Sequence, residues 1–168
     1  RSYSVTGVQT CALPILKLMD NNTIKEFIKG KRLAAIDYGR KRVGFAVCDE
    51  FHVTVNPRHT FFLEDKNFWE DLSNELIKEN VSAIVVGVPY REEPEKNELI
   101  KEIICFIDEL KQKITIPVYE FDENFSSKEA MLTMINIGKK KKQRATKTNI
   151  DKIAAAIILR NFLKEIEG

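Results

Sequence analysis

The chain has 168 residues, of which 43% are hydrophobic and 31% are charged, and its formal net charge is +2. This length and composition fit one globular domain with a sizeable core, and they exclude collagen-like and largely disordered chains. The small net charge excludes nucleic-acid binding through overall charge, so any such binding must come from local basic clusters.

The cysteines and the hydropathy pattern indicate the cytoplasm as the cellular compartment. None of Cys11, Cys48 and Cys105 forms a CxxC pair, and no His and Cys group has the spacing of a zinc site. No apolar run approaches the length of a membrane span. We therefore expect reduced thiols, a cytoplasmic location and no membrane partner.

The first 18 residues have a pattern that does not belong to a folded domain. The segment VTGVQTCALPI is similar to the in-frame translation of a common sequencing adaptor, and no signal-peptide pattern is present. We expect residues 1–18 to be a non-native leader, the natural start to be Met19 and residues 19–168 to form a single domain. A natural, disordered N-terminus is the alternative, and it would leave the rest unchanged.

The first part of the domain predicts an antiparallel meander. Apolar residues 33–37 and 43–48 predict two short strands, and the turn YGRKR joins them, with Gly39 able to take a positive φ. Residues 53–63 predict a third strand that is interrupted or ended at Pro57, because proline donates no hydrogen bond to a sheet.

The rest of the chain alternates helices with strands. Apolar residues at helical spacing predict helices over 67–80, 95–114, 126–138 and 148–166. Continuous apolar runs predict strands over 82–88 and 116–121, covered on both faces. A meander followed by alternating helices and strands indicates an α/β fold with a mixed sheet.

Acidic residues stand at the ends of predicted elements, where α/β sheets tend to place their sites. Asp37 ends the first strand, Asp122 and Glu123 end the last strand, and Asp151 lies in the first turn of the closing helix. Carboxylates forced together repel, and hard cations such as Mg²⁺ or Mn²⁺ prefer oxygen ligands. If these elements are neighbours, the sequence predicts a two-metal site for phosphodiester cleavage.

Basic residues lie beside two of these acids. One cluster, Arg40 to Arg42, begins three residues after Asp37, and the run GKKKKQRATK at 138–147 precedes Asp151. We predict that the basic side chains contact the phosphates of a nucleic acid. The residues concerned are Arg40, Lys41, Arg42, Lys139, Lys140, Lys141, Lys142 and Arg144. For the second run, a solvated loop is the alternative.

Four segments carry a family resemblance, namely AAIDYGRKRVGFAVCD, AIVVGVPY, VYEFDENFSSKEA and NIDKIAAAIIL. In this order and spacing, between about residues 31 and 166, they resemble the motifs of the YqgF family, also called RuvX. The resemblance implies an RNase H-like α/β fold. Its five-stranded mixed sheet would hold a three-strand antiparallel meander plus two parallel strands, flanked by helices. Members are described as Holliday junction resolvases or pre-16S rRNA nucleases.

The resemblance also implies a site. Three acids, Asp37, Glu123 and Asp151, would be catalytic and would bind Mg²⁺ or Mn²⁺. The implied activity is a nuclease on structured nucleic acid, with maturation of the 5′ end of pre-16S rRNA preferred over a Holliday junction. The chain would act as a monomer or homodimer.

The chain departs from the family pattern in two places. Asn124 removes a positive charge that the family usually has, and the acidic segment 92–98 replaces a glycine-containing loop and disfavours nucleic acid locally. These departures leave open a non-catalytic module that binds nucleic acid or ribosome-assembly factors.

Each acid also has a purely structural interpretation. Asp37 could end a strand and begin a turn. Asp122 could face the site instead of Glu123, because adjacent strand residues point to opposite sides. Thr148 and Asp151 could form a capping-box-like pair that stabilises a helix terminus without any function.

A phosphotransferase is a further alternative. DYGRKRVG also resembles the first phosphate loop of actin-like sugar kinases and chaperone ATPases. Those enzymes bind ATP between two such domains, and this chain has room for one. It also lacks a Walker-type GxxxxGK[ST] loop.

Overall fold

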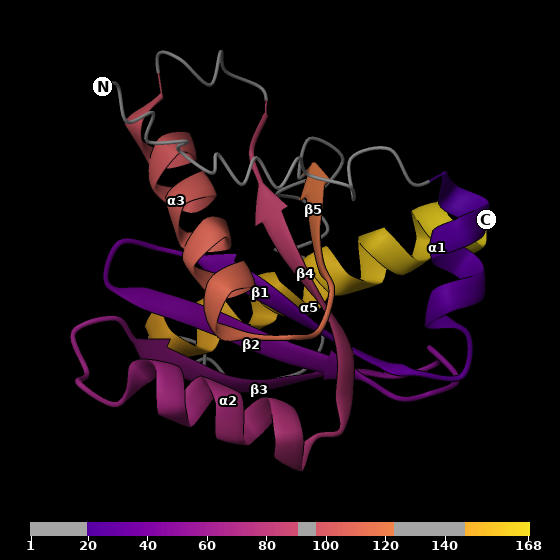
Figure 1. Ribbon diagram of the computed structural model, residues 1–168, viewed down its shortest axis with the longest axis horizontal. Helices are drawn as coiled ribbons and strands as arrows, with labels where there is room; N and C mark the ends of the chain where they lie inside the picture. Colours follow the sequence, from indigo (N-terminus) through magenta and orange to yellow (C-terminus); the bar gives the residue numbers. More distant parts are fainter. Residues whose placement is uncertain (1–19, 91–96, 123–146) are drawn as a thin grey trace, which may run out of the picture.

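A computed structural model describes residues 20–90, 97–122 and 147–168. These residues form a five-stranded sheet with helices on both faces (Figure 1). The strands are β1 (Arg32–Tyr38), β2 (Arg42–Cys48), β3 (Val55–Phe62), β4 (Val81–Val88) and β5 (Val118–Asp122). The helices are α1 (Asn21–Ile28), α2 (Phe68–Lys78), α3 (Glu98–Lys113) and α5 (Lys147–Glu167). None of these helices is long and apolar enough to cross a bilayer.

The sheet has the order β3-β2-β1-β4-β5. β2 pairs antiparallel with both β1 and β3, and β4 pairs parallel with both β1 and β5. The predicted meander and the two parallel strands are therefore confirmed. Because β1, β4 and β5 run in the same direction, their carboxyl ends meet at one edge of the sheet.

Both faces of the sheet are buried, and side-chain alternation assigns each strand residue to one of them. Ala34 and Ile36 of β1 pack in a core with α2 and α3, which we call the α3 face. Leu33 and Ala35 pack in a second core with α1 and α5, which we call the α5 face. Figure 1 shows α2 and α3 in front of the sheet and α5 crossing behind it.

The structure settles two details of the meander. β3 does not end at Pro57, since it is an edge strand, where a missing N–H is tolerated. Its pairing with β2 is interrupted there, as the alternative prediction has it, by a register shift beside the proline. Gly39 does not have a positive φ. Gly39 and Arg42 instead close the turn with reciprocal backbone hydrogen bonds, 2.9 Å and 3.2 Å long.

Helix α1 was not predicted. Asp20 caps it by accepting a hydrogen bond from the Thr23 N–H at 3.0 Å, and Ile24 and Ile28 are buried on the α5 face. The signal was an N-cap aspartate followed by apolar residues four apart. A helix of eight residues is too short to give a strong periodicity.

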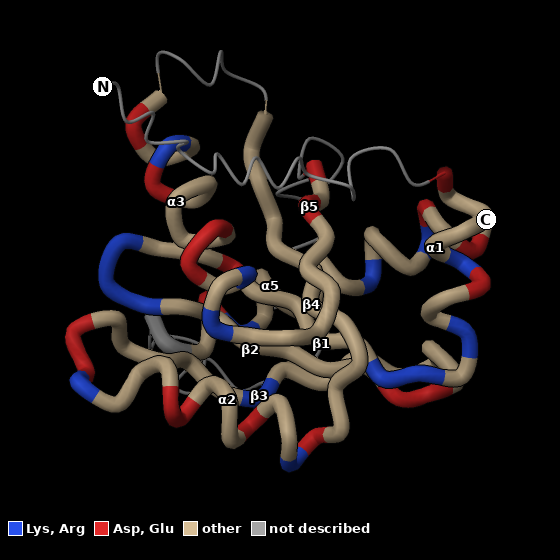
Figure 2. The backbone as a smooth tube through the Cα atoms, in the orientation of Figure 1, with Lys and Arg blue, Asp and Glu red and all other residues tan. Residues whose placement is uncertain are grey.

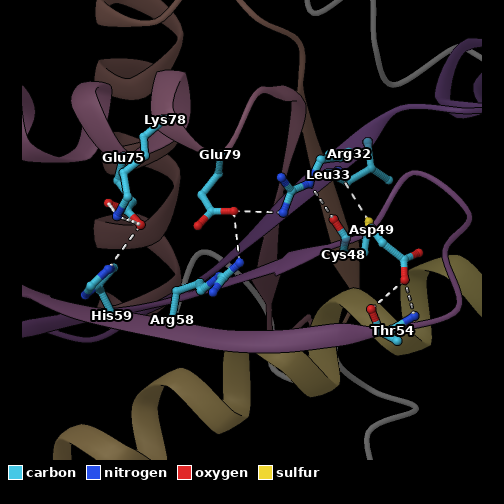
Figure 3. A network of polar contacts seen from close by, with 10 residues as sticks. All are labelled: Arg32, Leu33, Cys48, Asp49, Thr54, Arg58, His59, Glu75, Lys78 and Glu79. Atoms are coloured by element: carbon cyan, nitrogen blue, oxygen red, sulfur yellow. Dashed lines mark hydrogen bonds and ion pairs between the residues drawn. The ribbon is translucent and has the colours of Figure 1, made fainter.

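A polar network joins α2 to the sheet at the end far from Asp37 (Figure 3). Glu79, which follows α2 and is buried, accepts hydrogen bonds from Arg32 of β1 at 2.8 Å and from Arg58 of β3 at 3.1 Å. Beside it, burial raises the pKa of the Cys48 thiol to about 11, so this cysteine is protonated at neutral pH. We interpret this end of the molecule as structural.

Candidate functional site

Asp37 lies at the carboxyl end of β1, on the α5 face. The alternation that puts Leu33 and Ala35 on this face and Ile36 on the other continues to Asp37, which is half-buried. Its cross-strand partner on β2 is Gly44. The side chain of Asp37 thus points toward the side of the sheet that α5 covers.

Gly44 is the point at which α5 touches the sheet most closely. A Cβ atom at this position would lie 2.1 Å from the carbonyl oxygen of Asp151 and 2.4 Å from its carbonyl carbon. Only glycine leaves room for that backbone. Since Gly44 is paired with Asp37 and neighbouring strands lie about 4.8 Å apart, the backbone of Asp151 is set beside Asp37.

Asp151 is held by an ion pair with Arg42. The Nε atom of Arg42 donates to Oδ2 of Asp151 at 2.6 Å, across the same face of β2 that carries Gly44. Helix α5 has no acidic residue in its first turn. The prediction that Asp151 lies in the first turn is therefore wrong, and its interpretation as a helix-terminal acid does not apply.

The other basic residues of the turn lie differently. Arg40 contacts two carboxylates of α3, with its Nε 3.0 Å from Glu102 and its Nη2 4.0 Å from Glu98. The hydrogen bond to Glu102 raises the pKa of Arg40 above its ordinary value. Lys41 is exposed at the tip of the turn. Figure 2 shows this basic stretch at the left of the view, with acidic segments along α3.

Asp122 lies on the face opposite to Asp37. Along β5, Tyr119 and Phe121 pack on the α5 face, whereas Val118 packs on the α3 face. Glu120, also on the α3 face, contacts Lys111 of α3 at 3.3 Å. By the same alternation Asp122 points toward α3. It does not belong to the surface that carries Asp37 and Asp151.

The segment after β4 also turns toward the α3 face. The Tyr90 hydroxyl donates a hydrogen bond to Oε2 of Glu120 at 2.7 Å. Burial and this neighbouring carboxylate raise the pKa of Tyr90 above its ordinary value, so the phenol remains protonated. The aromatic ring of the VGVPY motif is thus not part of the surface around Asp37.

Several predicted site residues lie outside the described residues. They are Glu123 and the basic residues Lys139, Lys140, Lys141, Lys142 and Arg144, and the departure from the family pattern at Asn124 also lies there. Within residues 20–90, 97–122 and 147–168, no three His, Cys, Asp or Glu side chains lie close enough together to hold a metal ion. Of the three predicted acids, the structure therefore describes two, Asp37 and Asp151.

Gly44 is the functional position that the sequence analysis missed. An isolated glycine inside an otherwise apolar strand often marks a close approach of another backbone. The stretch VGFAV contains that signal. The sequence alone did not indicate which segment approaches it.

Comparison with known proteins matches residues 31–165 to the family described as "RuvX: Holliday junction resolvase". A Bacteroides fragilis protein named "Putative pre-16S rRNA nuclease" is 37% identical over 134 residues, covering 79% of this chain and 96% of the relative. An identically named protein of Orientia tsutsugamushi is 30% identical over 153 residues, covering 88% of this chain and 95% of the relative.

Among solved structures, RuvC of T. thermophilus in complex with a Holliday junction substrate is similar in fold. The TM-score is 0.51 at 15% sequence identity, and the match covers 80% of this chain and 95% of the other. This likeness establishes the RNase H-like fold, and the sequence comparisons establish the family. The chain belongs to the RuvX family of nucleases.

Proposed function

We propose that this protein is a divalent-metal-dependent nuclease that hydrolyses phosphodiester bonds in structured nucleic acid. Its preferred substrate would be the 5′ end of pre-16S rRNA, in keeping with the names of its relatives. The observation that carries the proposal is the approach of α5 to Gly44, because it sets Asp151 beside Asp37 on one face of the sheet.

The residues present fit a hard divalent cation. Carboxylate oxygens are the donors that Mg²⁺ and Mn²⁺ prefer, and the Arg42 guanidinium on Asp151 indicates that this surface attracts positive charge. We propose that Asp37, Glu123 and Asp151 hold Mg²⁺ or Mn²⁺. When bound, such ions activate a water and stabilise the leaving oxygen of a phosphodiester.

The choice of Glu123 as the third acid rests on the family resemblance, and the orientation of Asp122 supports it. Tyr119 and Phe121 point to the α5 face and Asp122 does not. Glu123 is therefore the acid of this pair that we assign to the site.

The basic residues would hold the substrate without taking part in the chemistry. Lys41 is exposed at the turn beside Asp37. Together with Arg42, the run Lys139–Lys142 and Arg144, it would contact backbone phosphates, which carry no sequence information. Arg40 is left out of this set because it pairs with Glu98 and Glu102 of α3. Binding through such contacts weakens steeply as salt concentration rises.

A cleavage assay tests the proposed function. Wild type, Asp37→Asn and Asp151→Asn are incubated with a 5′-extended 16S precursor RNA or a four-way DNA junction, in Mg²⁺, Mn²⁺ or chelator. We expect cleavage of the RNA by wild type with metal only. Each variant should lose about 100-fold or more, because even outer-shell partners of a metal contribute 10–100-fold.

Three further variants complete that experiment. Glu123→Gln should lose activity whereas Asp122→Asn should keep it, since Asp122 lies on the other face. Asp108→Asn, exposed on α3, is the matched control for removing a carboxylate. Cleavage by Asp37→Asn at the wild-type rate would refute the metal site. Cleavage of the junction alone would favour a resolvase, which needs a dimer for a two-fold symmetric substrate.

A further inference from the structure

Arg42 was predicted to contact phosphates, but the structure gives its guanidinium another partner. It lies on the α5 face and donates to Asp151, one of the two described acids of the candidate site, at 2.6 Å. The pair joins residues 109 positions apart in the chain. A positive charge of the protein itself is thus placed on a carboxylate that we assign to a metal.

The backbone fixes where this pair forms. The close approach at Gly44 holds the Asp151 main chain against β2, two residues along the strand from Arg42. Residues two apart on a strand share a face, so both side chains lie on the same surface. The position of the Asp151 main chain is therefore set by the contact at Gly44 and not by the guanidinium.

The contact has the character of an exchangeable ion pair. Within the described residues it is a single hydrogen bond from Nε, not a two-pronged contact, and the side chains of Arg42 and Asp151 are 28% and 21% exposed. By contrast, Glu79 is 9% exposed and is shared by two arginines. Water can hydrate the Arg42 guanidinium after release, which lowers the cost of separating it from Asp151.

We propose that Arg42 is an internal counter-ion that occupies Asp151 until a divalent cation binds, and that it competes with the cation for this carboxylate. The inference rests on the proposed function, because it takes Asp151 as a metal ligand. Two carboxylates side by side repel, and the guanidinium offsets this repulsion in the absence of metal. Once displaced, the side chain is free to meet a substrate phosphate beside the ions.

Direct Mn²⁺ binding without nucleic acid tests this competition. Calorimetry or Mn²⁺ electron spin resonance is applied to wild type, Arg42→Gln, Arg42→Lys and Arg40→Gln. We expect Arg42→Gln to bind Mn²⁺ roughly tenfold more tightly, the change for removing one partly exposed charge-assisted competitor. Arg42→Lys should bind Mn²⁺ with an affinity near that of wild type, because lysine keeps the positive charge. If Arg42→Gln does not fold, Arg42→Lys is measured in its place.

Arg40→Gln is the matched control. Arg40 lies in the same turn but pairs with Glu102 and Glu98 on α3, so its removal should leave Mn²⁺ affinity unchanged. Equal or weaker Mn²⁺ binding by Arg42→Gln would overturn the proposal and leave Arg42 as an anchor for α5. Failure of the proposed function has a different signature, namely no Mn²⁺ binding, or binding that survives both Asp37→Asn and Asp151→Asn.

Discussion

Gly44 determines where Asp151, a candidate catalytic residue, lies, because a glycine has no side chain that would keep α5 away from β2. The backbone of Asp151 occupies the space in which a Cβ atom would stand, and Asp37 is the cross-strand partner of the same glycine. The distance between the two carboxylates therefore depends on how closely α5 packs against β2. The close packing of α5 on β2 at Gly44 is thus also what places Asp151 beside Asp37.

Replacing Gly44 by alanine tests that dependence. The added methyl group would overlap the Asp151 main chain, so α5 must move, and we expect the free energy of unfolding to fall by about 1–3 kcal/mol. The Mn²⁺ affinity should fall as well, because Asp151 moves away from Asp37. Urea denaturation and Mn²⁺ calorimetry measure the two effects.

Gly30→Ala is the control for Gly44→Ala, because it introduces backbone strain without displacing α5. Gly30 has a φ of +70°, and no atom lies within 4 Å of an added Cβ. This variant should lose about 1 kcal/mol of stability through backbone strain alone and should bind Mn²⁺ like wild type. Wild-type stability and Mn²⁺ affinity in Gly44→Ala would contradict the packing account.

At the scale of elements, α2 is fastened to the sheet at the end of β1 far from the candidate site. Glu79 draws Arg32 of β1 and Arg58 of β3 together, and Glu75 contacts His59 at 3.0 Å (Figure 3). These contacts join three elements that are distant in the chain. The two ends of the sheet thus have separate roles, anchoring at one and the candidate chemistry at the other.

Glu79→Gln should destabilise the fold and spare the site. The substitution removes a buried charge that two arginines share, and we expect a loss of about 1–2 kcal/mol in the free energy of unfolding, reduced by the partial exposure of both arginines. Lys78→Ala, which removes an exposed partner of Glu75, should cost no more than about 0.5 kcal/mol. Mn²⁺ affinity should be unchanged in both variants. A lower Mn²⁺ affinity in Glu79→Gln would show that the polar network around Glu79 influences the candidate site, and would contradict separate roles for the two ends of the sheet.

For the whole molecule, hydrophobic periodicity predicted the strands and an α/β fold with a mixed sheet, and the family resemblance supplied the five-stranded arrangement flanked by helices. Continuous and alternating apolar runs gave the five strands to within a few residues. The N-terminal α1 was missed because one short helix carries little periodic signal. Whether β3 ends at Pro57 or is only interrupted there was left open, because edge position depends on strand order. Local patterns carry no information about which strand ends up at an edge.

The candidate site was predictable only in part. Asp37 and Asp151 were chosen from their places at element ends and from the family motifs, and the structure places both on the α5 face. The ion pair of Arg42 with Asp151 could not be foreseen, since it depends on the exact crossing of α5 over β2. Side-chain partners between segments so distant in the chain follow from packing, which no local motif encodes.

The central claim is that Asp37 and Asp151 bind the same divalent ions. Anomalous diffraction from crystals soaked in Mn²⁺ measures this directly. We predict Mn²⁺ peaks with oxygen atoms of both carboxylates within about 2.5 Å, and the Arg42 guanidinium displaced from Asp151. Crystals with no peak at these side chains, or with Mn²⁺ bound elsewhere while Arg42 stays on Asp151, would contradict the account.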